Sequence, residues 1–198
     1  MAGRVLDFGR GSKPYQFLFT RARDYIGLDI ENEGHSHAKE QIDYYYDGSR
    51  IPFGNESFDA CFCSEVLEHV TDLRMTLTEI HRVLKKGAPM LVSVPFAWGE
   101  HETPNDFRRL SQYGVLSALR QAGFSVSELT ISGHYIEVLF SLFIEYMRRR
   151  LFGKYVLING LLTVLVLAPL TMVALLVEKI LPKDSSLYFR TIVCCEKV

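Results

Sequence analysis

The sequence predicts an α/β protein with a doubly wound, mostly parallel sheet. Short apolar segments alternate along the chain with segments in which apolar residues recur every three or four positions. The first apolar segment ends in an acid and two glycines, Asp7, Gly9 and Gly11, and the second ends beside another acid, Asp29. In open parallel sheets the carboxyl ends of neighbouring strands form the ligand-binding edge. We therefore expect these four residues to lie at one such edge.

The first part of the chain contains four expected strands and one helix. The strands are expected at residues 4–9, 25–30, 42–46 and 58–64, which are apolar or aromatic and are separated by polar or glycine-containing segments. The helix is expected at residues 15–23, because Pro14 fits a first helical turn and Phe17 and Leu18 can face inward.

The second part continues the alternation. Helices are expected at residues 73–85, where apolar residues recur at helical spacing, and at residues 111–122, between the cap residues Ser111 and Gly123. The remaining strands are expected at residues 90–96, 125–132 and 187–195.

The charge balance and the cysteines narrow the class of protein. The chain has 22 Lys and Arg residues against 23 Asp and Glu residues, which argues against nucleic-acid binding, because that function usually leaves a basic footprint. The cysteines form two close pairs, Cys61 with Cys63 and Cys194 with Cys195, without the C-x-x-C spacing of zinc sites. We expect reduced thiols, no metal, a cytoplasmic location and no signal peptide.

The glycine pattern separates two classes of nucleoside cofactor. A dinucleotide site typically shows G-x-G-x-x-G, but Pro14 occupies the third glycine position. Asp7, two residues before the first glycine, is not part of that fingerprint. Both observations favour S-adenosylmethionine, which has no pyrophosphate but has an amino-acid end to hold.

Four motifs follow one another between residues 4 and 124. The first strand carries D-x-G-x-G, and residues 47–59 fit D-G-x-x-I-P-F-x-x-x-S-F-D. Residues 64–70 read S-E-V-L-E-H-V, and residues 79–87 are close to E-I-x-R-V-L-K-P-G-G. This series resembles the class I S-adenosylmethionine-dependent methyltransferases, in their type-11 or UbiE-like branch. The resemblance implies a Rossmann-like, seven-stranded sheet whose last strand is antiparallel and lies between its two predecessors.

The resemblance also implies which residues contact the cofactor. Asp7, Gly9 and Gly11 would line the methionine end, and Asp29 would bind the ribose hydroxyls. The other implied cofactor residues are Asp47 and Gly48 at the adenine, and Ser64 and Glu65 under the methionyl group.

The segment after the fifth strand carries the expected acceptor site. Residues 95–111 resemble the P-F-x-W-x-x-H-E-x-P-x-D-F-x-R-x-T signature of a subgroup often associated with bacterial cell-surface polysaccharide loci. His101 is the expected general base, since histidine titrates near neutral pH, and Glu100 is a weaker candidate. The expected acceptor-binding residues are Trp98, Asp106 and Arg108.

Structural alternatives stay open for several of these residues. Asp47 is also a typical turn residue, because its side chain can accept hydrogen bonds from the backbone that follows it. His101, Asp106 and Arg108 can equally form a hydrogen-bond network that only fixes the loop. Glu68 and His69 are interpreted as residues that can simply cap and solvate a loop.

An apolar segment interrupts the sequence that forms the sheet. Residues 134–185 are expected as a helical insert between residues 1–133 and 186–198, which together form the methyltransferase domain. Residues 155–177 contain no charged residue and are long enough to span a bilayer. However, a single span would leave the last strand across the membrane from its own sheet. In a two-span hairpin, the first arm, residues 135–147, would be too short.

We therefore expect helices that lie in one leaflet of the membrane. Arg148, Arg149 and Arg150 would meet anionic headgroups, and Pro169 would kink the second helix. Burial of the insert in a homodimer, or against its own domain, is the alternative.

The sequence thus predicts an S-adenosylmethionine-dependent methyltransferase that is peripheral or monotopic at the cytoplasmic face of the cell membrane. The expected acceptor is a sugar hydroxyl of a glycolipid or polysaccharide intermediate. A lipophilic small molecule of quinone type is the second candidate. A non-catalytic, membrane-associated scaffold that keeps the fold is the third. Membrane lipid is the expected partner, with a second copy of the chain as the alternative.

Overall fold

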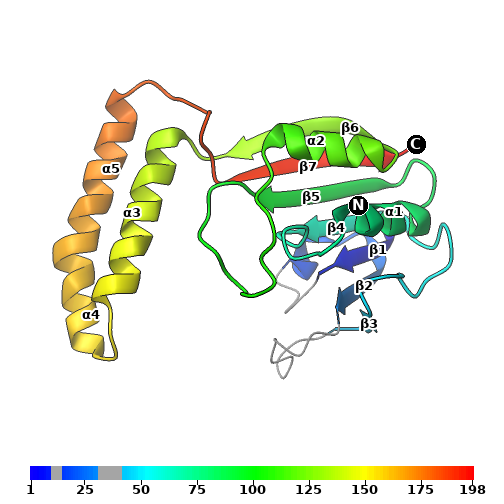
Figure 1. The fold of residues 1–198 in the computed structure, drawn as a ribbon, viewed down its shortest axis with the longest axis horizontal. Helices are drawn as coiled ribbons and strands as arrows, with labels where there is room; N and C mark the ends of the chain where they lie inside the picture. The colour runs from blue at the N-terminus through cyan, green and yellow to red at the C-terminus, as the bar shows by residue number, and fades with distance from the viewer. Residues whose placement is uncertain (10–14, 31–41) are drawn as a thin grey trace. The chain divides into compact units, whose positions relative to one another are not determined.

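The structure, a computed structural model, describes residues 1–9, 15–30 and 42–198. Gly11, one of the expected cofactor residues, lies outside the described residues. A seven-stranded sheet with the order β3-β2-β1-β4-β5-β7-β6 forms the framework (Figure 1). Its strands are β1 (Gly3–Phe8), β2 (Ala22–Ile30), β3 (Tyr44–Tyr46), β4 (Ala60–Ser64), β5 (Pro89–Pro95), β6 (Phe124–Ser132) and β7 (Arg190–Lys197).

The helical elements divide between the connections of the sheet and the insert before β7. The connections contain the 3₁₀ helix η1 (Gln16–Leu18) and the α-helices α1 (Leu73–Val83) and α2 (Gln112–Gln121). The insert contains α3 (Tyr135–Leu151), α4 (Val156–Leu162), a π-helical segment (Thr163–Leu167) and α5 (Ala168–Ile180).

The strand directions confirm the expected topology. The strands β1 and β2, β1 and β4, β2 and β3, and β4 and β5 pair in parallel. The last strand runs the other way: the amide of Lys197 donates to Ala88 just before β5, and Phe189, just before β7, accepts from the amide of Phe96 just after β5. The sheet is therefore mixed, with β7 antiparallel between β5 and β6.

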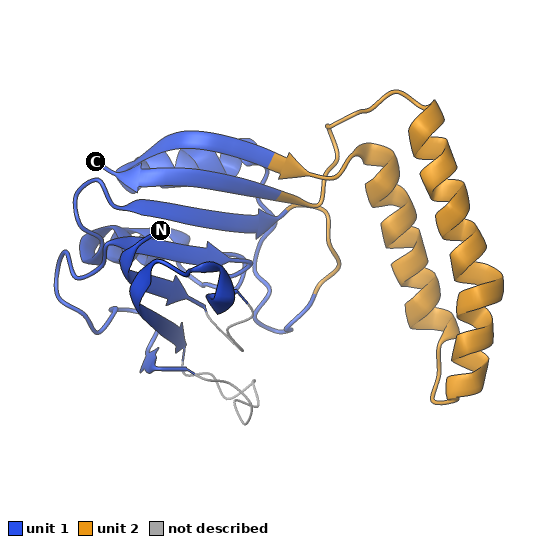
Figure 2. Ribbon diagram, turned by 180° about the vertical axis from the view of Figure 1, so that it is seen from behind, with its two compact units in different colours: residues 1–95, 101–130, 191–198 blue, residues 96–100, 131–190 orange. Residues whose placement is uncertain are grey.

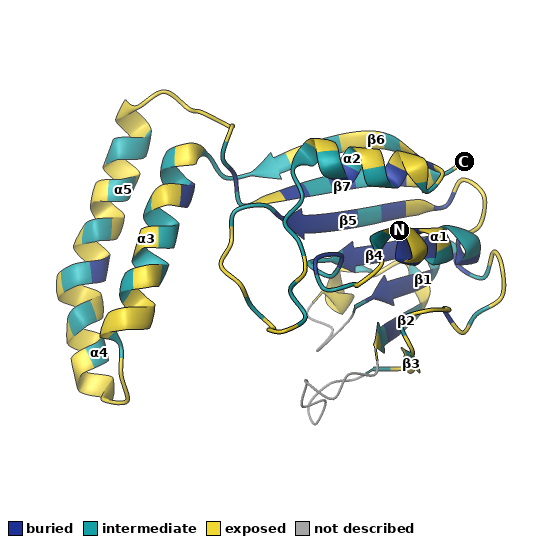
Figure 3. Cartoon of the chain, in the orientation of Figure 1, coloured by how far each residue is buried: buried dark blue, intermediate teal, exposed yellow. Residues whose placement is uncertain are grey.

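The main core lies between the sheet and the helices α1 and α2, which contact each other (Figure 3). Asp72 begins α1, because its side chain accepts a hydrogen bond from the amide of Met75. The buried face of α1 then follows the helical period, and the burial of each of its large apolar side chains contributes about 1.5–3 kcal/mol. The buried residues of the two helices are Thr76, Leu77, Ile80, Val83, Val115 and Leu119.

The helix expected at residues 15–23 is wrong. Only the single 3₁₀ turn η1 forms, and β2 already begins at Ala22. The reason is tertiary: Phe19 packs against the ring of Phe62 on β4 and against the ring of Tyr25 on β2. These contacts hold the segment around Phe19 against the sheet, and Phe17 remains exposed instead of facing inward.

The chain divides into two compact units (Figure 2). The first comprises residues 1–95, 101–130 and 191–198 and contains most of the sheet. The second comprises residues 96–100 and 131–190 and contains the helical hairpin of α3 and α5.

The hairpin exposes most of its apolar side chains (Figure 3). Within the described residues, the continuous helix Val156–Ile180 is the one that is long and apolar enough to cross a bilayer by length and composition. Leu157 is 90% exposed, and only Leu167 is classed as buried among the residues of this helix. A surface of this kind is unusual for a monomeric soluble protein and typically marks an interaction site.

Pro169 is accommodated inside this helix instead of ending it. The π-helical segment directly precedes the proline, and the amide of Ala168 donates to the carbonyl of Thr163, five residues earlier. Proline has no amide hydrogen to donate, so a local change in the hydrogen-bond pattern is the usual way for a helix to continue through it.

The end of β1 depends on Gly9. Its φ angle is +74°, and its amide donates to the carbonyl of Leu28 on β2 over 2.8 Å. A Cβ atom at this position would lie 2.2 Å from Cγ1 of Val66, in the segment that follows β4. Gly9 is therefore required both by its backbone conformation and by the lack of space.

We predict that Gly9→Ala destabilises the fold more than Gly87→Ala does. Gly87 has a similar φ of +72°, but a Cβ there would have nothing within 4 Å, so this variant reports the backbone strain alone. We expect a loss of about 1–2 kcal/mol for Gly87→Ala and about 1–3 kcal/mol more for Gly9→Ala, because of the overpacking against Val66. Urea unfolding followed by far-UV circular dichroism measures both values, and equal losses would contradict the clash with Val66.

Candidate functional site

The carboxyl edge of the sheet brings together the two residues on which the expected cofactor site depends. Phe8 pairs with Leu28 in the register of β1 and β2, so Gly9 and Asp29 follow as neighbours at the strand ends. Asp29 is half-buried, and its Oδ1 accepts a hydrogen bond from the amide of Ile30 over 2.8 Å. The strand order reverses between β1 and β4, which is where ligands bind in open α/β sheets.

Asp7 lies on β1, two residues before Gly9, and its side chain is inside the protein. The residue is buried, and its Oδ2 accepts a hydrogen bond of 2.7 Å from the hydroxyl of Tyr25 on β2. The carboxylate thus links the two strands below the point where Gly9 and Asp29 emerge. Its expected contact with the cofactor stays a prediction.

Asp47 and Gly48 form a turn beside the tip of β2. Oδ1 of Asp47 accepts hydrogen bonds from the amide and the hydroxyl of Ser49, at 2.9 and 2.6 Å, and these bonds hold the pKa of Asp47 below its ordinary value. Gly48 has a φ of +82°, and a Cβ there would lie 3.0 Å from Cδ1 of Ile30. The turn role of Asp47 is therefore observed, and it places Gly48 next to the strand end that carries Asp29.

Ser64 and Glu65 lie on the other side of β1, at the end of β4. The hydroxyl of Ser93 on β5 donates to Oε1 of Glu65 over 2.8 Å and therefore accepts from the hydroxyl of Ser64 over 2.9 Å. Glu65 has a φ of +56°, which is rare for a residue with a side chain and occurs preferentially at functional sites.

This arrangement fits an adenosyl compound that carries an amino-acid end. Gly9 turns the chain at the end of β1 close beside Val66, and a half-buried carboxylate, Asp29, stands beside it for ribose hydroxyls. A second carboxylate, Glu65, lies across β1 at the strand end where an ammonium group is expected.

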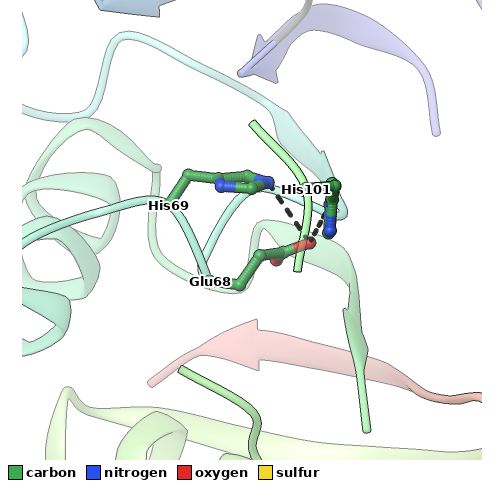
Figure 4. Close-up of side chains that lie close together, drawn as sticks. All are labelled: Glu68, His69 and His101. Atoms are coloured by element: carbon green, nitrogen blue, oxygen red, sulfur yellow. Dashed lines mark ion pairs between the residues drawn. The ribbon is translucent and has the colours of Figure 1, made fainter. Parts of the chain in front are cut away.

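A second group of side chains surrounds Glu68, three residues beyond Glu65. Glu68 is 1% exposed, and among the described residues neither of its carboxylate oxygens has a hydrogen-bond partner. Oε1 of Glu68 lies 3.7 Å from Nε2 of His69 and 4.0 Å from Nε2 of His101 (Figure 4). Burial raises the pKa of Glu68 to about 8. The interpretation of Glu68 as a solvated loop residue is wrong, because tertiary packing encloses it.

An ion pair between Asp106 and Arg109, which is not part of the predicted network of His101, Asp106 and Arg108, holds the loop that carries His101. Asp106 accepts a backbone hydrogen bond from His101 over 3.0 Å, and both of its oxygens accept from Arg109, Oδ2 at 2.6 Å. The Arg109 guanidinium lowers the pKa of Asp106 to about 2. Asp106 is thereby engaged with the chain itself, so its expected contact with an acceptor stays a prediction.

Arg108 has a clear structural role. Its guanidinium donates to the carbonyls of Leu67, Val70 and Thr71, at 2.9, 2.5 and 2.9 Å. These bonds fasten the segment after β4 to the segment that carries His101. The geometry favours the loop-fixing alternative for Arg108, and its contact with an acceptor stays a prediction.

Trp98 and Glu100 belong to the second compact unit, whereas His101 belongs to the first. Trp98 is exposed, and its ring lies 6.3 Å from the ring of Phe189. Glu100 is exposed as well. Their roles toward an acceptor stay predictions.

Comparison with known proteins shows which family the residues of this site match. Residues 6–92 match the family described as "Methyltransferase domain", of type 11. A malonyl-[acyl-carrier protein] O-methyltransferase of Erwinia pyrifoliae is 28% identical over 153 residues, which are 69% of this chain and 56% of that protein. The chain spans about half the length of the curated relatives it matches.

Solved structures share the fold. The [4+2]-cyclase SpnF has a TM-score of 0.59 at 20% identity, covering 99% of this chain and 76% of that one. An S-adenosylmethionine-dependent methyltransferase from Mesorhizobium loti has a TM-score of 0.57 at 15% identity, covering 99% and 92%. Both the sheet topology and the matched motifs therefore agree: residues 6–92 form a methyltransferase domain of the type-11 branch, in a chain with the class I methyltransferase fold.

Proposed function

We propose that this protein transfers a methyl group from S-adenosylmethionine to an oxygen atom of an acceptor. The observation that carries the proposal is the adjacency of Gly9 and Asp29 at the point where the strand order reverses, within the residues that match the methyltransferase family. The relative from Erwinia pyrifoliae is named as an O-methyltransferase, which supports oxygen as the accepting atom. The fold alone would not suffice, since one similar structure is titled a cyclase.

In this proposal the chain binds and aligns the reactants. When bound, S-adenosylmethionine supplies the methyl group from its sulfonium, and transfer is an in-line displacement in which proximity is the main contribution. Asp29 accepts hydrogen bonds from the ribose hydroxyls, and Glu65 faces the ammonium of the methionine end. His101 takes the proton of the acceptor hydroxyl at Nε2, the ring atom that is turned toward Glu68.

We further propose that the acceptor is a sugar hydroxyl of a glycolipid or polysaccharide intermediate at the cytoplasmic face of the membrane. The resemblance of residues 95–111 to a signature from polysaccharide loci and the exposed apolar hairpin support this acceptor. The hairpin would equally suit a lipophilic small molecule of quinone type, which is the second candidate. A scaffold that keeps the fold without catalysis is the third, and cofactor binding separates it from the other two.

The hairpin suits a position in the membrane interface. The helix Val156–Ile180 has 25 residues and is therefore about 38 Å long, but β7 must return to the sheet that β6 has left. The partner helix α3 has 17 residues, or about 26 Å, which is short for a bilayer core of about 30 Å. Basic residues follow its apolar part at Arg148–Arg150. We therefore propose that the hairpin lies along one leaflet.

Asp29→Asn should weaken the binding of S-adenosylmethionine by about 10–150-fold, which corresponds to the loss of about 1.5–3 kcal/mol from a charged hydrogen bond. The matched control is Asp24→Asn, which changes an exposed acid at the other end of β2 and should leave the affinity within about twofold. Isothermal titration calorimetry measures both. Equal affinities of the two variants would remove Asp29 from the cofactor site.

His101→Ala should reduce methyl transfer by at least about 10²-fold, which is the usual contribution of a general base. The affinity for S-adenosylmethionine should not change, because His101 is not among the residues assigned to the cofactor. Release of S-adenosylhomocysteine in the presence of a membrane extract measures the transfer, and His134→Ala is the control. Full turnover of His101→Ala would eliminate this residue from the transfer step.

The double variant Leu161→Asp, Leu165→Asp should prevent binding to lipid vesicles. Both leucines are exposed on one side of the hairpin helix, and the loss of their burial in lipid costs about 3–6 kcal/mol, or at least about 100-fold in partitioning. Phe17→Asp, Leu18→Asp changes two equally exposed apolar residues of η1 and should still float with vesicles. A wild-type chain that stays unbound and forms a monodisperse dimer without detergent would support the interface between two copies instead.

A further inference from the structure

The buried carboxylate of Glu68 requires a positively charged or hydrogen-bonding partner. Neither of its oxygens has a hydrogen-bond partner among the described residues, although the side chain is 1% exposed. An enclosed carboxylate without a partner costs several kcal/mol, so such groups in proteins are normally paired or coordinate a metal. Figure 4 shows the carboxylate pointing toward the imidazole rings of both His69 and His101.

His69 has the tautomer that metal coordination needs. Its Nδ1 lies 2.8 Å from the main-chain carbonyl of Asn105, and a carbonyl can only accept, so the hydrogen is on Nδ1. The lone pair is therefore on Nε2, which lies 3.7 Å from Oε1 of Glu68. A metal-bound histidine typically donates its other ring N–H to a carbonyl in this way.

His101 also turns its Nε2 toward Glu68, at 4.0 Å from Oε1, while its Nδ1 lies 3.5 Å from Oδ2 of Asp106 and 3.4 Å from Nη2 of Arg109. A carboxylate behind the ring is the other common support for a metal-bound histidine. Glu102 adds a further carboxylate, with Oε2 at 3.6 Å from Nε2 of His69.

The two segments that carry these side chains are fixed to each other. Arg108 holds three carbonyls of the segment after β4, and the amide of Phe107 donates to the carbonyl of Glu68 itself over 2.9 Å. The side chains thus converge on an arrangement that is held in place by the backbone, and preorganisation of this kind is what a metal site requires.

We propose that Glu68, His69 and His101 bind a divalent transition-metal cation of the Zn²⁺ type. One ligand atom from each residue can be chosen so that all three atoms lie within 4.8 Å of one another. In a tetrahedral zinc site the ligand atoms are about 3.4 Å apart. The two distances to Oε1 of Glu68, 3.7 and 4.0 Å, therefore need to shorten by about 0.3 and 0.6 Å, and the widest separation in the cluster needs to shorten by up to about 1.4 Å. Two imidazoles and one carboxylate suit Zn²⁺ and similar cations, and leave a coordination position for an outside oxygen.

The cation would change how the acceptor hydroxyl loses its proton in the proposed reaction. With Nε2 of His101 bound to the cation, that atom no longer serves as the base, and the cation instead binds the acceptor hydroxyl and favours the loss of its proton to water. This role rests on the proposed function, whereas the binding of the cation does not. The two parts are therefore tested separately.

The first experiment measures metal binding by the full chain, prepared without a histidine tag and stripped of metal with a chelator. Equilibrium dialysis against Zn²⁺ should give one bound cation per chain. Binding of Co²⁺ should give the visible absorption bands that are typical of four-coordinate, tetrahedral Co²⁺. The variants Glu68→Gln, His69→Ala and His101→Ala should each bind at least about 100-fold more weakly, since even supporting residues of metal sites contribute about 10–100-fold.

The controls are Glu128→Gln and His134→Ala, which change the same residue types outside the cluster and should bind like the wild type. Circular dichroism confirms that each variant is folded, and Glu68→Gln is expected to fold because glutamine has nearly the same shape and carries no charge to bury. The absence of stoichiometric uptake, or equal uptake by the three cluster variants and the controls, overturns the proposal.

A second measurement separates this proposal from the proposed function. If the chain takes up Co²⁺ but does not bind S-adenosylmethionine, the proposed metal site is supported and the proposed methyltransferase function is rejected. If both bind, addition of a chelator should abolish methyl transfer and leave the affinity for S-adenosylmethionine unchanged. Undiminished transfer without metal would overturn the role of the cation in the reaction.

Discussion

The candidate site depends on the pairing of β1 with a parallel neighbour on each side. Because β2 and β4 flank β1 in parallel, the segments that follow all three strands emerge at the same edge of the sheet. Gly9 then turns the chain where Val66 leaves no space for a side chain, and Asp29 and Glu65 stand to either side. The register of the sheet alone brings these groups together, so no conformational change is needed to assemble them.

The features of the sequence that were most predictive are local. The alternation of apolar segments, the glycine motif and the caps of α2 each involve residues close together in the chain, and the seven strands and the antiparallel β7 follow as the motifs implied. The helix expected at residues 15–23 failed, because Phe19 is held by rings on β2 and β4 that lie far away in sequence. Local propensity is a weak guide where a distant strand offers such a partner.

The same reason explains what the sequence could not reveal about the site. Glu68 and His69 looked like polar loop residues, but Glu68 is buried in the structure and lies beside His101, which is 33 positions later in the sequence. Arg108 and Arg109 are adjacent, yet one holds backbone carbonyls and the other holds Asp106. The signature over residues 95–111 predicts an acceptor region, which stays a prediction, and it did not assign the hydrogen-bond partners within that segment.

The position of β7 has a consequence for the order in which the protein can fold during synthesis. β7 can take its place between β5 and β6 only after the whole hairpin of α3 and α5 has been synthesised. Until then, the edges of β5 and β6 that pair with β7 have no hydrogen-bond partners. During this interval the apolar hairpin has already left the ribosome. If the hairpin takes the membrane position proposed for it, its apolar side chains would be covered during this interval and kept from aggregating before β7 is made.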